Sequence, residues 1–132
     1  MMQKMTVNFL DGESYSVAVR GHEFTVDQPL DAGGDDLGPT PVELFTASLA
    51  TCVGYYAGRY LARHGLPREG LRVETEFALA GDRPARVGEV RMRLVVPGEL
   101  PEQRRKALAA VVNHCTVHNS IRQPPHVVID VD

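Results

Sequence analysis

One apolar segment, residues 44–61, constrains the fold of this chain more than any other feature of its sequence. On a helix drawn through it, apolar and small residues fall on every side, and the helix becomes polar only from Arg59 to His64. A helix that is apolar all round is a buried helix, because each of its faces needs a cover. We therefore expect a sheet or another subunit to enclose it.

Both ends of this helix are marked in the sequence. Thr40 is placed as the N-cap, Pro41 as the first helical residue and Glu43 as the acidic member of a capping box. Gly65 has the position of the glycine that commonly follows a last helical turn. The predicted helix carries Cys52 near its middle.

The composition is that of a soluble globular protein. The chain has 132 residues, 43% of them hydrophobic and 23% charged, so we expect one domain, residues 1–132, with a core of its own. A net charge of −3 argues against nucleic acid or an anionic membrane surface as a partner. No segment has the length and apolarity of a signal peptide or a membrane span. We therefore expect the cytoplasm, where cysteines stay reduced unless their chemistry is redox.

Outside the long helix, alternating apolar and polar residues predict antiparallel hairpins. Two-residue turns are expected at 11–12 and 21–22, and residues 28–39 should form a loop. Glutamates 74 and 76 should pair across two strands with arginines 91 or 93. The order βββ-α-ββ-α-β places the fold in the α+β class. The predicted strands are residues 5–10, 14–19, 24–26, 71–80, 87–96 and 127–129, and the second helix is 101–114.

The two cysteines, Cys52 and Cys115, are 63 positions apart, which matches no zinc-ribbon or CxxC spacing. One interpretation is that both are inert core residues, because buried cysteine often acts as a small hydrophobe. The other is that both point from apolar helices into one interior. A cysteine pair that meets in a reducing compartment is more often catalytic or redox-sensing than structural.

A working thiol must ionise, and Cys52, in mid-helix, needs a nearby cation for that. Arg59 lies on the same helix face but about 10 Å along the axis. Arg20, beside a hairpin turn, is the other candidate for this cation. The plainer interpretation is that Arg20 is only a solvated residue of the turn. Glu43 precedes Cys52 by nine residues, which puts the two on opposite sides of the helix and about 13.5 Å apart along it. Glu43 therefore either belongs only to the capping box or serves the Cys52 of a partner subunit.

A third interpretation concerns His114, Cys115 and His118. Their spacing suits metal ligation, with Cys52 as a further ligand. His118 is also placed to act as a general base for either thiol, although a surface histidine at a helix end is the simpler interpretation.

Two stretches carry a resemblance to a known family. GGDDLGPTPVELFTASLATC contains the pattern P-x-E-L-[LF]-x-A-x-x-A-x-C, and NHCTVHNSI places V-x-N-[ST] shortly after the second cysteine. The chain resembles, over nearly its whole length, the osmotically inducible protein C and organic hydroperoxide resistance (OsmC/Ohr) family, in its OsmC-like branch. The resemblance implies an α+β fold with antiparallel sheets around two long central helices. It also implies an intertwined homodimer with two active sites at its interface.

The resemblance further implies a thiol peroxidase that needs no cofactor. Cys52 would attack the O–O bond of an organic hydroperoxide and become a sulfenic acid, and Cys115 would condense with it to a disulfide. A dithiol reductant, a lipoylated protein in the better-known branch, would reset the pair. Arg20 and Glu43 would be the activating residues. The apolar side chains around Cys52 favour organic peroxides.

One position departs from the hydroperoxide-resistance branch. There the glutamate directly follows the motif proline, whereas this chain has Val42 at that position and Glu43 one residue later, turned by about 100° on a helix. This departure favours a second hypothesis from another class. In it, the protein is a non-enzymatic dimer that senses redox state or binds a small molecule.

Overall fold

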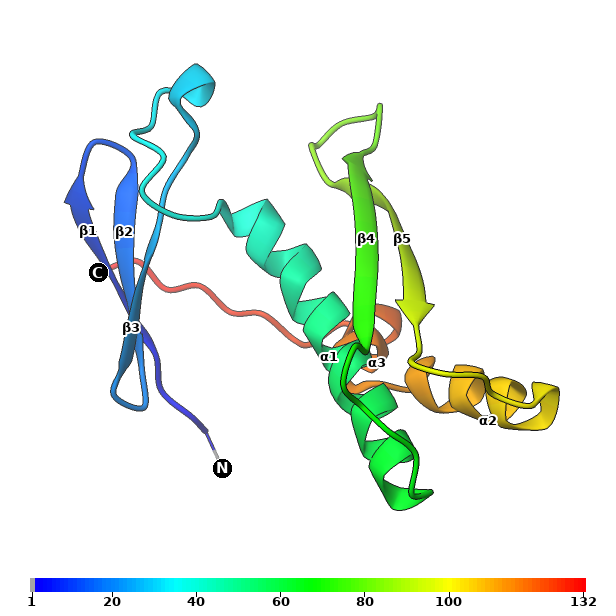
Figure 1. Ribbon diagram of the computed structural model, residues 1–132. Helices are drawn as coiled ribbons and strands as arrows, with labels where there is room; N and C mark the ends of the chain where they lie inside the picture. Colours follow the sequence, from blue (N-terminus) through cyan, green and yellow to red (C-terminus); the bar gives the residue numbers. More distant parts are fainter. Residues whose placement is uncertain (1) are drawn as a thin grey trace. The chain divides into compact units, whose positions relative to one another are not determined.

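The computed structural model describes residues 2–132 and confirms the α+β class, with antiparallel sheets (Figure 1). The chain divides into two compact units, the first ending at Phe45 and the second spanning Thr46–Asp132. The elements are β1 (Thr6–Asp11), β2 (Ser14–Val19), β3 (His22–Val26), the short 3₁₀ helix η1 (Leu30–Ala32), α1 (Pro41–Arg63), β4 (Arg72–Leu79), β5 (Val87–Val95), α2 (Glu102–Val112) and α3 (Thr116–Arg122).

The first unit holds an antiparallel sheet in the order β1-β2-β3. Both of its hairpin turns lie one residue from the predicted position. Val19 pairs with His22, so the second turn consists of Arg20 and Gly21, whose φ angles are 49° and 81°. These positive values suit a tight hairpin, but they are uncommon for an arginine, which is why the sequence pointed to Gly21 and His22 instead. In the first hairpin Asp11 pairs with Ser14, so the turn is 12–13.

The loop between β3 and α1 is organised by one buried carboxylate. Asp27 is 1% exposed, and its two oxygens accept hydrogen bonds from the backbone amides of Gln28 (2.7 Å), Asp35 (3.2 Å) and Leu37 (3.1 Å). A Cβ atom at Gly34 would lie 2.0 Å from the Gln28 carbonyl oxygen, so the loop requires glycine there. Burial alone would raise the pKa of Asp27, but the three amide hydrogen bonds outweigh it and lower this pKa below its ordinary value.

This arrangement predicts an acid-sensitive loop. A carboxyl group whose pKa is lower in the folded state stabilises that state above its unfolded pKa of about 3.9, and the stabilisation disappears as pH falls through the folded pKa. Asp27→Asn should therefore lower the Tm at pH 7, and its Tm should approach that of the wild type in acid. Thermal unfolding at both pH values tests this, with the exposed Asp36→Asn as control. Equal Tm values for Asp27→Asn and the wild type at pH 7 would contradict it.

In the second unit, α1 packs on the inner face of the antiparallel hairpin β4–β5 (Figure 1). Two glycines of α1 face β4 and the residue before it, at distances where an added methyl group would make ordinary contact. A Cβ atom at Gly58 would lie 3.7 Å from Leu71, and one at Gly54 would lie 3.6 Å from Val73. Two buried clusters fill the interior, each with further half-buried apolar side chains around it. One is Ala57, Tyr60, Leu61 and Leu108, and the other is Leu49, Val53 and Cys115.

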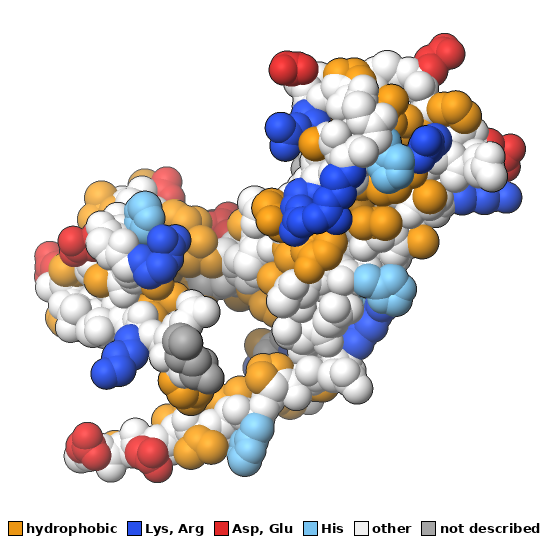
Figure 2. Space-filling view, turned by 90° about the horizontal axis from the view of Figure 1, so that it is seen from below, with side chains coloured by type: hydrophobic (Ala, Val, Ile, Leu, Met, Phe, Trp, Pro, Cys, Tyr) orange, Lys and Arg blue, Asp and Glu red, His pale blue; other side chains and the backbone are white. Residues whose placement is uncertain are grey.

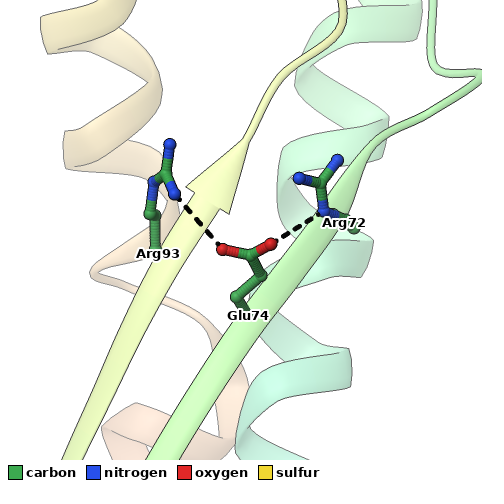
Figure 3. A network of polar contacts seen from close by, with 3 residues as sticks. All are labelled: Arg72, Glu74 and Arg93. Carbon is green, nitrogen blue, oxygen red and sulfur yellow. Dashed lines mark hydrogen bonds and ion pairs between the residues drawn. The ribbon is translucent and has the colours of Figure 1, made fainter.

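Some of the predicted charge pairs form on the outer face of the β4–β5 hairpin, and others do not. Glu74 binds both Arg93 across the strands (3.4 Å) and Arg72 on its own strand (3.0 Å), as Figure 3 shows. Glu76 stands opposite Arg91 in register, but Arg91 pairs with Glu89 instead (3.0 Å). All of these groups are exposed, so each pair contributes at most about 1 kcal/mol.

The C-terminal part differs from the prediction in two ways. The second helix ends at Val112, and a further short helix, α3, follows Cys115. The predicted strand at 127–129 is wrong, because these residues do not form a strand in the structure and Ile129 is 82% exposed. A strand exists only when its backbone is paired, and a run of β-branched residues does not show which edge would pair with it.

None of the helices among residues 2–132 is both long and apolar enough to cross a lipid bilayer.

Candidate active site

The two cysteines meet in the second buried cluster, although α1 supplies one of them and the segment before α3 supplies the other. Cys115 is fully buried with Leu49 and Val53, and Cys52 packs against this cluster. Both side chains are free thiols. They are close enough for the Cys52 thiol to affect the ionisation of Cys115. Two sulfurs from distant segments thus share one apolar environment.

Cys115 is the N-cap residue of α3, with extended backbone angles of φ −67° and ψ 151°. Two side chains of α3 hold the connection that delivers it from α2. Arg122 donates from Nη1 to the carbonyl oxygen of Asn113 (3.0 Å), and Asn119 donates from Nδ2 to that of His114 (3.0 Å). These bonds fix the short turn in which the sulfur sits.

A tyrosine links the two thiol-bearing segments. The hydroxyl of Tyr56, one turn after Cys52 on α1, lies 2.7 Å from Oγ1 of Thr116, the first residue of α3. This hydrogen bond joins α1 to α3 beside the two sulfurs. Either hydroxyl can be the donor in this bond.

The two thiols differ in exposure and electrostatics. Burial raises the pKa of the Cys115 thiol, and the neighbouring Cys52 raises it further, although the backbone amides of His118 and Val117 oppose the rise. Cys115 therefore stays protonated at neutral pH. Cys52 is only partly buried and is the more accessible sulfur.

His118 is a neutral imidazole at neutral pH. Its burial, together with the charges of Arg122 and His114, lowers the pKa of its ring below the ordinary value. It therefore supplies no cation to the thiols. Within residues 2–132, no group of three His, Cys, Asp or Glu side chains is arranged to hold a metal ion, so the metal interpretation of His114, Cys115, His118 and Cys52 finds no ligand set there.

The predicted activating residues both lie in the first unit. Arg20 occupies the exposed turn between β2 and β3. Glu43 forms the predicted capping box, because its Oε1 accepts from the Thr40 amide (2.8 Å) while Thr40 Oγ1 accepts from the Glu43 amide (3.1 Å). On α1, Arg59 lies over the ring of Tyr55, 5.5 Å from its centroid. The structure thus brings the two thiols together and leaves Arg20 and Glu43 as predictions.

Sequence reasoning missed two polar side chains of the second unit. One is Tyr56, whose hydroxyl partner in a segment 60 residues away has no local signal. The other is Thr75, whose Oγ1 is buried without a hydrogen-bond partner. The sequence could have indicated this residue, because Thr75 is a hydroxyl-bearing residue among the otherwise apolar inward positions of its strand.

Comparisons with known proteins bear on the family and the fold of this chain. The family model described as "OsmC-like protein" matches residues 33–130. None of the curated proteins compared with the chain matches its sequence. Solved structures with the same fold include an osmotic stress-induced and detoxification response protein from Psychrobacter arcticus 273-4. Its TM-score is 0.82 at 24% identity, covering 91% of this chain and 88% of its own.

Two further structures are organic hydroperoxide resistance proteins by their descriptions. OsmC of Legionella pneumophila has a TM-score of 0.70 at 20% identity, covering 92% of this chain and 90% of its own. OhrB of Bacillus subtilis has a TM-score of 0.64 at 18% identity, covering 94% and 93%. At these identities the structures establish the shared fold, and the family model covers well over half of the sequence. The chain therefore belongs to the OsmC-like protein family.

Proposed function

We propose that the protein is a thiol-dependent peroxidase that reduces organic hydroperoxides through a Cys52 sulfenic acid and a Cys52–Cys115 disulfide. The observation that carries this proposal is the meeting of two free thiols from distant segments in one apolar cluster. The family includes proteins described by organic hydroperoxide resistance, which supports a redox role of this kind.

The reaction proceeds in three balanced steps. The Cys52 thiolate attacks the terminal oxygen of the hydroperoxide, an S–O bond forms as the O–O bond breaks, and the alkoxide takes a proton to leave as an alcohol. Cys115 then attacks the Cys52 sulfur, an S–S bond forms, and the hydroxyl leaves as water. A dithiol reductant, such as the dihydrolipoyl group of a lipoylated protein, finally reduces the disulfide and becomes oxidised itself.

The asymmetry of the two sulfurs supports this division of roles. Cys52 is the accessible one, which suits a nucleophile that must meet a substrate. Cys115 is fully buried, and its raised pKa keeps a proton on its sulfur until condensation. That proton leaves with the Cys52 hydroxyl as water.

We infer that the working form is a homodimer in the cytoplasm. One face of the sheet in the first unit is apolar, and Phe9 on its strand β1 is nevertheless 62% exposed. On α1, in the second unit, Tyr55 is 59% exposed. Figure 2 shows apolar side chains reaching the surface on the face that it displays. A second copy of the chain would cover such residues, which monomers rarely expose in large patches. Arg20 and Glu43 would then act on the Cys52 of the partner.

A second candidate function rests on the capping box. The Glu43 carboxylate is bound to the Thr40 amide, and Val42 stands where the hydroperoxide-resistance branch has its glutamate. Without an activated Cys52, the same dimer would act as a redox sensor or small-molecule binder. Such a protein would oxidise once and would not sustain peroxide loss.

The two candidates are separated by counting thiols and turnovers. The protein is treated with a slight excess of an alkyl hydroperoxide, and its free thiols are counted before and after. We expect both thiols to disappear, and peroxide consumption to continue when a dithiol is supplied. Survival of both thiols would contradict the peroxidase, whereas oxidation without turnover would identify the sensor. Arg20→Ala in the same assay shows whether that guanidinium activates Cys52.

A further inference from the structure

A hollow opens between the end of β5 and one face of α2, within the second unit. Its volume is about 370 Å³, which lies in the range of small-molecule sites. Leu94, Val96 and Leu100, from the end of β5 and the segment after it, line one side of this hollow. These three side chains are only partly buried around the cluster that contains Leu108. The apolar interior of the second unit is therefore incompletely filled at this edge.

The other side of the hollow follows one face of α2. Arg105, Leu108, Ala109 and Val112 line it, at spacings of three and four residues that bring side chains to the same face of a helix. Ala109 stands in the middle of this face, and its small side chain leaves room that a larger one would take. From Arg105 to Val112 the helix rises about 10.5 Å, so the hollow is elongated along it. We call this hollow the α2 groove.

Arg105 supplies the charge of the α2 groove. Within residues 2–132, its guanidinium forms no ion pair, and its Nη2 donates one long hydrogen bond, 3.5 Å, to the carbonyl oxygen of Leu100. The nearby carboxylate of Glu102 pairs with Lys106 instead (3.8 Å). A guanidinium has five N–H donors in a planar fork, so donors remain at Arg105 for an anion.

The α2 groove is separate from the thiol pair. Neither Cys52 nor Cys115 lines it, and Val112 is the one lining residue that also packs against the cluster containing Cys115. A molecule bound in the groove would therefore not have its reacting atoms at the sulfurs. The groove calls for a ligand other than the hydroperoxide of the proposed reaction.

We propose that the α2 groove binds an alkyl carboxylate, a medium-chain fatty acid anion, with its chain along α2 and its carboxylate at Arg105. Each methylene group that leaves water for the apolar walls favours binding. The planar fork of the guanidinium matches the two oxygens of a carboxylate. An inorganic anion would leave the apolar walls uncovered, and a neutral alkane would leave Arg105 without a counter-charge. This binding does not depend on the proposed peroxidase function.

The test titrates sodium octanoate into the ¹⁵N-labelled full chain and follows its backbone amide resonances. We expect saturable shifts at Leu94, Ala109 and Val112, which line the groove. Sodium acetate at the same concentrations should not cause them, because it has no chain to bury. Cys52→Ser should bind octanoate as the wild type does, since Cys52 does not line the groove. Shifts that do not saturate, or that map to the first unit instead, would overturn the inference.

Two matched pairs of variants test the two parts of the ligand. Ala109→Phe should weaken octanoate binding about tenfold or more, because the ring takes the space of the chain, whereas Ala110→Phe, outside the groove, should leave it unchanged. Arg105→Gln should weaken octanoate binding about threefold, as expected for an exposed charge pair, and should leave binding of octan-1-ol unchanged. Arg104→Gln removes the same charge outside the groove and should have no such effect. Equal losses in Arg104→Gln and Arg105→Gln would contradict a carboxylate held at Arg105.

The competing occupant of the α2 groove is a second copy of the chain. In that case octanoate would not bind, and Ala109→Phe would weaken self-association in sedimentation experiments while Ala110→Phe would not. That outcome overturns the inference. Octanoate binding to a protein that consumes no peroxide would remove the proposed function alone, and peroxide turnover without octanoate binding would remove this inference alone.

Discussion

Replacing Cys52 by serine should abolish hydroperoxide consumption, with a fall in rate of about a thousandfold or more. A serine hydroxyl at this position has no neighbouring base among its described partners, and an unactivated hydroxyl is a far weaker nucleophile than a thiolate. The substitution changes one atom at a partly buried position, so the fold should persist. Peroxide loss under a dithiol reductant measures the effect.

The matching control for this experiment is the circular dichroism spectrum and Tm of Cys52→Ser. A folded variant that still consumes peroxide at more than about a tenth of the wild-type rate would exclude Cys52 as the nucleophile. The remaining free thiol, Cys115, would then become the candidate. Its fully buried position makes that outcome unexpected.

Replacing Cys115 by serine should have a different result, a protein that reacts once and then stops. The Cys52 thiolate would still attack the peroxide, but no second sulfur would be present to displace the hydroxyl. The sulfenic acid should therefore persist and be visible in the intact mass as one added oxygen atom. It should also be trapped by a reagent specific for sulfenic acids, and turnover under a dithiol should fall by about tenfold or more.

The Cys115 site needs a second variant, because a serine hydroxyl at a fully buried position adds an unpaired polar group. Cys115→Ala removes the sulfur without adding a hydroxyl and should give the same trapped oxygen at Cys52. Rapid loss of that oxygen without a second thiol, with turnover equal to the wild type, would show that Cys115 does not resolve the sulfenic acid.

The long helix and its cap were predictable because their determinants are local. The side chains of Thr40 and Glu43 accept from each other's backbone amides, and residues within four positions set the helix. The hairpins were predictable as hairpins but not to the residue, since Arg20 adopts a positive φ that favours glycine. The strand expected at 127–129 failed because a strand depends on a partner that its own sequence does not specify.

The thiol pair was predictable only in outline. Apolar flanks at Cys52 and Cys115 indicated a common interior, and the structure brings them to one cluster. The position of Cys115 as the N-cap of a short helix was missed, because α3 has seven residues and little periodicity to detect. The buried carboxylate of Asp27, one residue before the predicted loop, was not singled out, since sequence does not show which aspartate will face three backbone amides.

The order of the elements between the two cysteines has a mechanical consequence. Cys52 and Cys115 stand on either side of β4, β5 and α2 in the chain. A bond between their sulfurs would close that whole stretch into a covalent ring, and a closed ring has far fewer conformations to gain when it unravels. The same oxidation in which the two cysteines give two electrons to a peroxide would therefore make the protein harder to denature, and reduction of the disulfide would loosen it again.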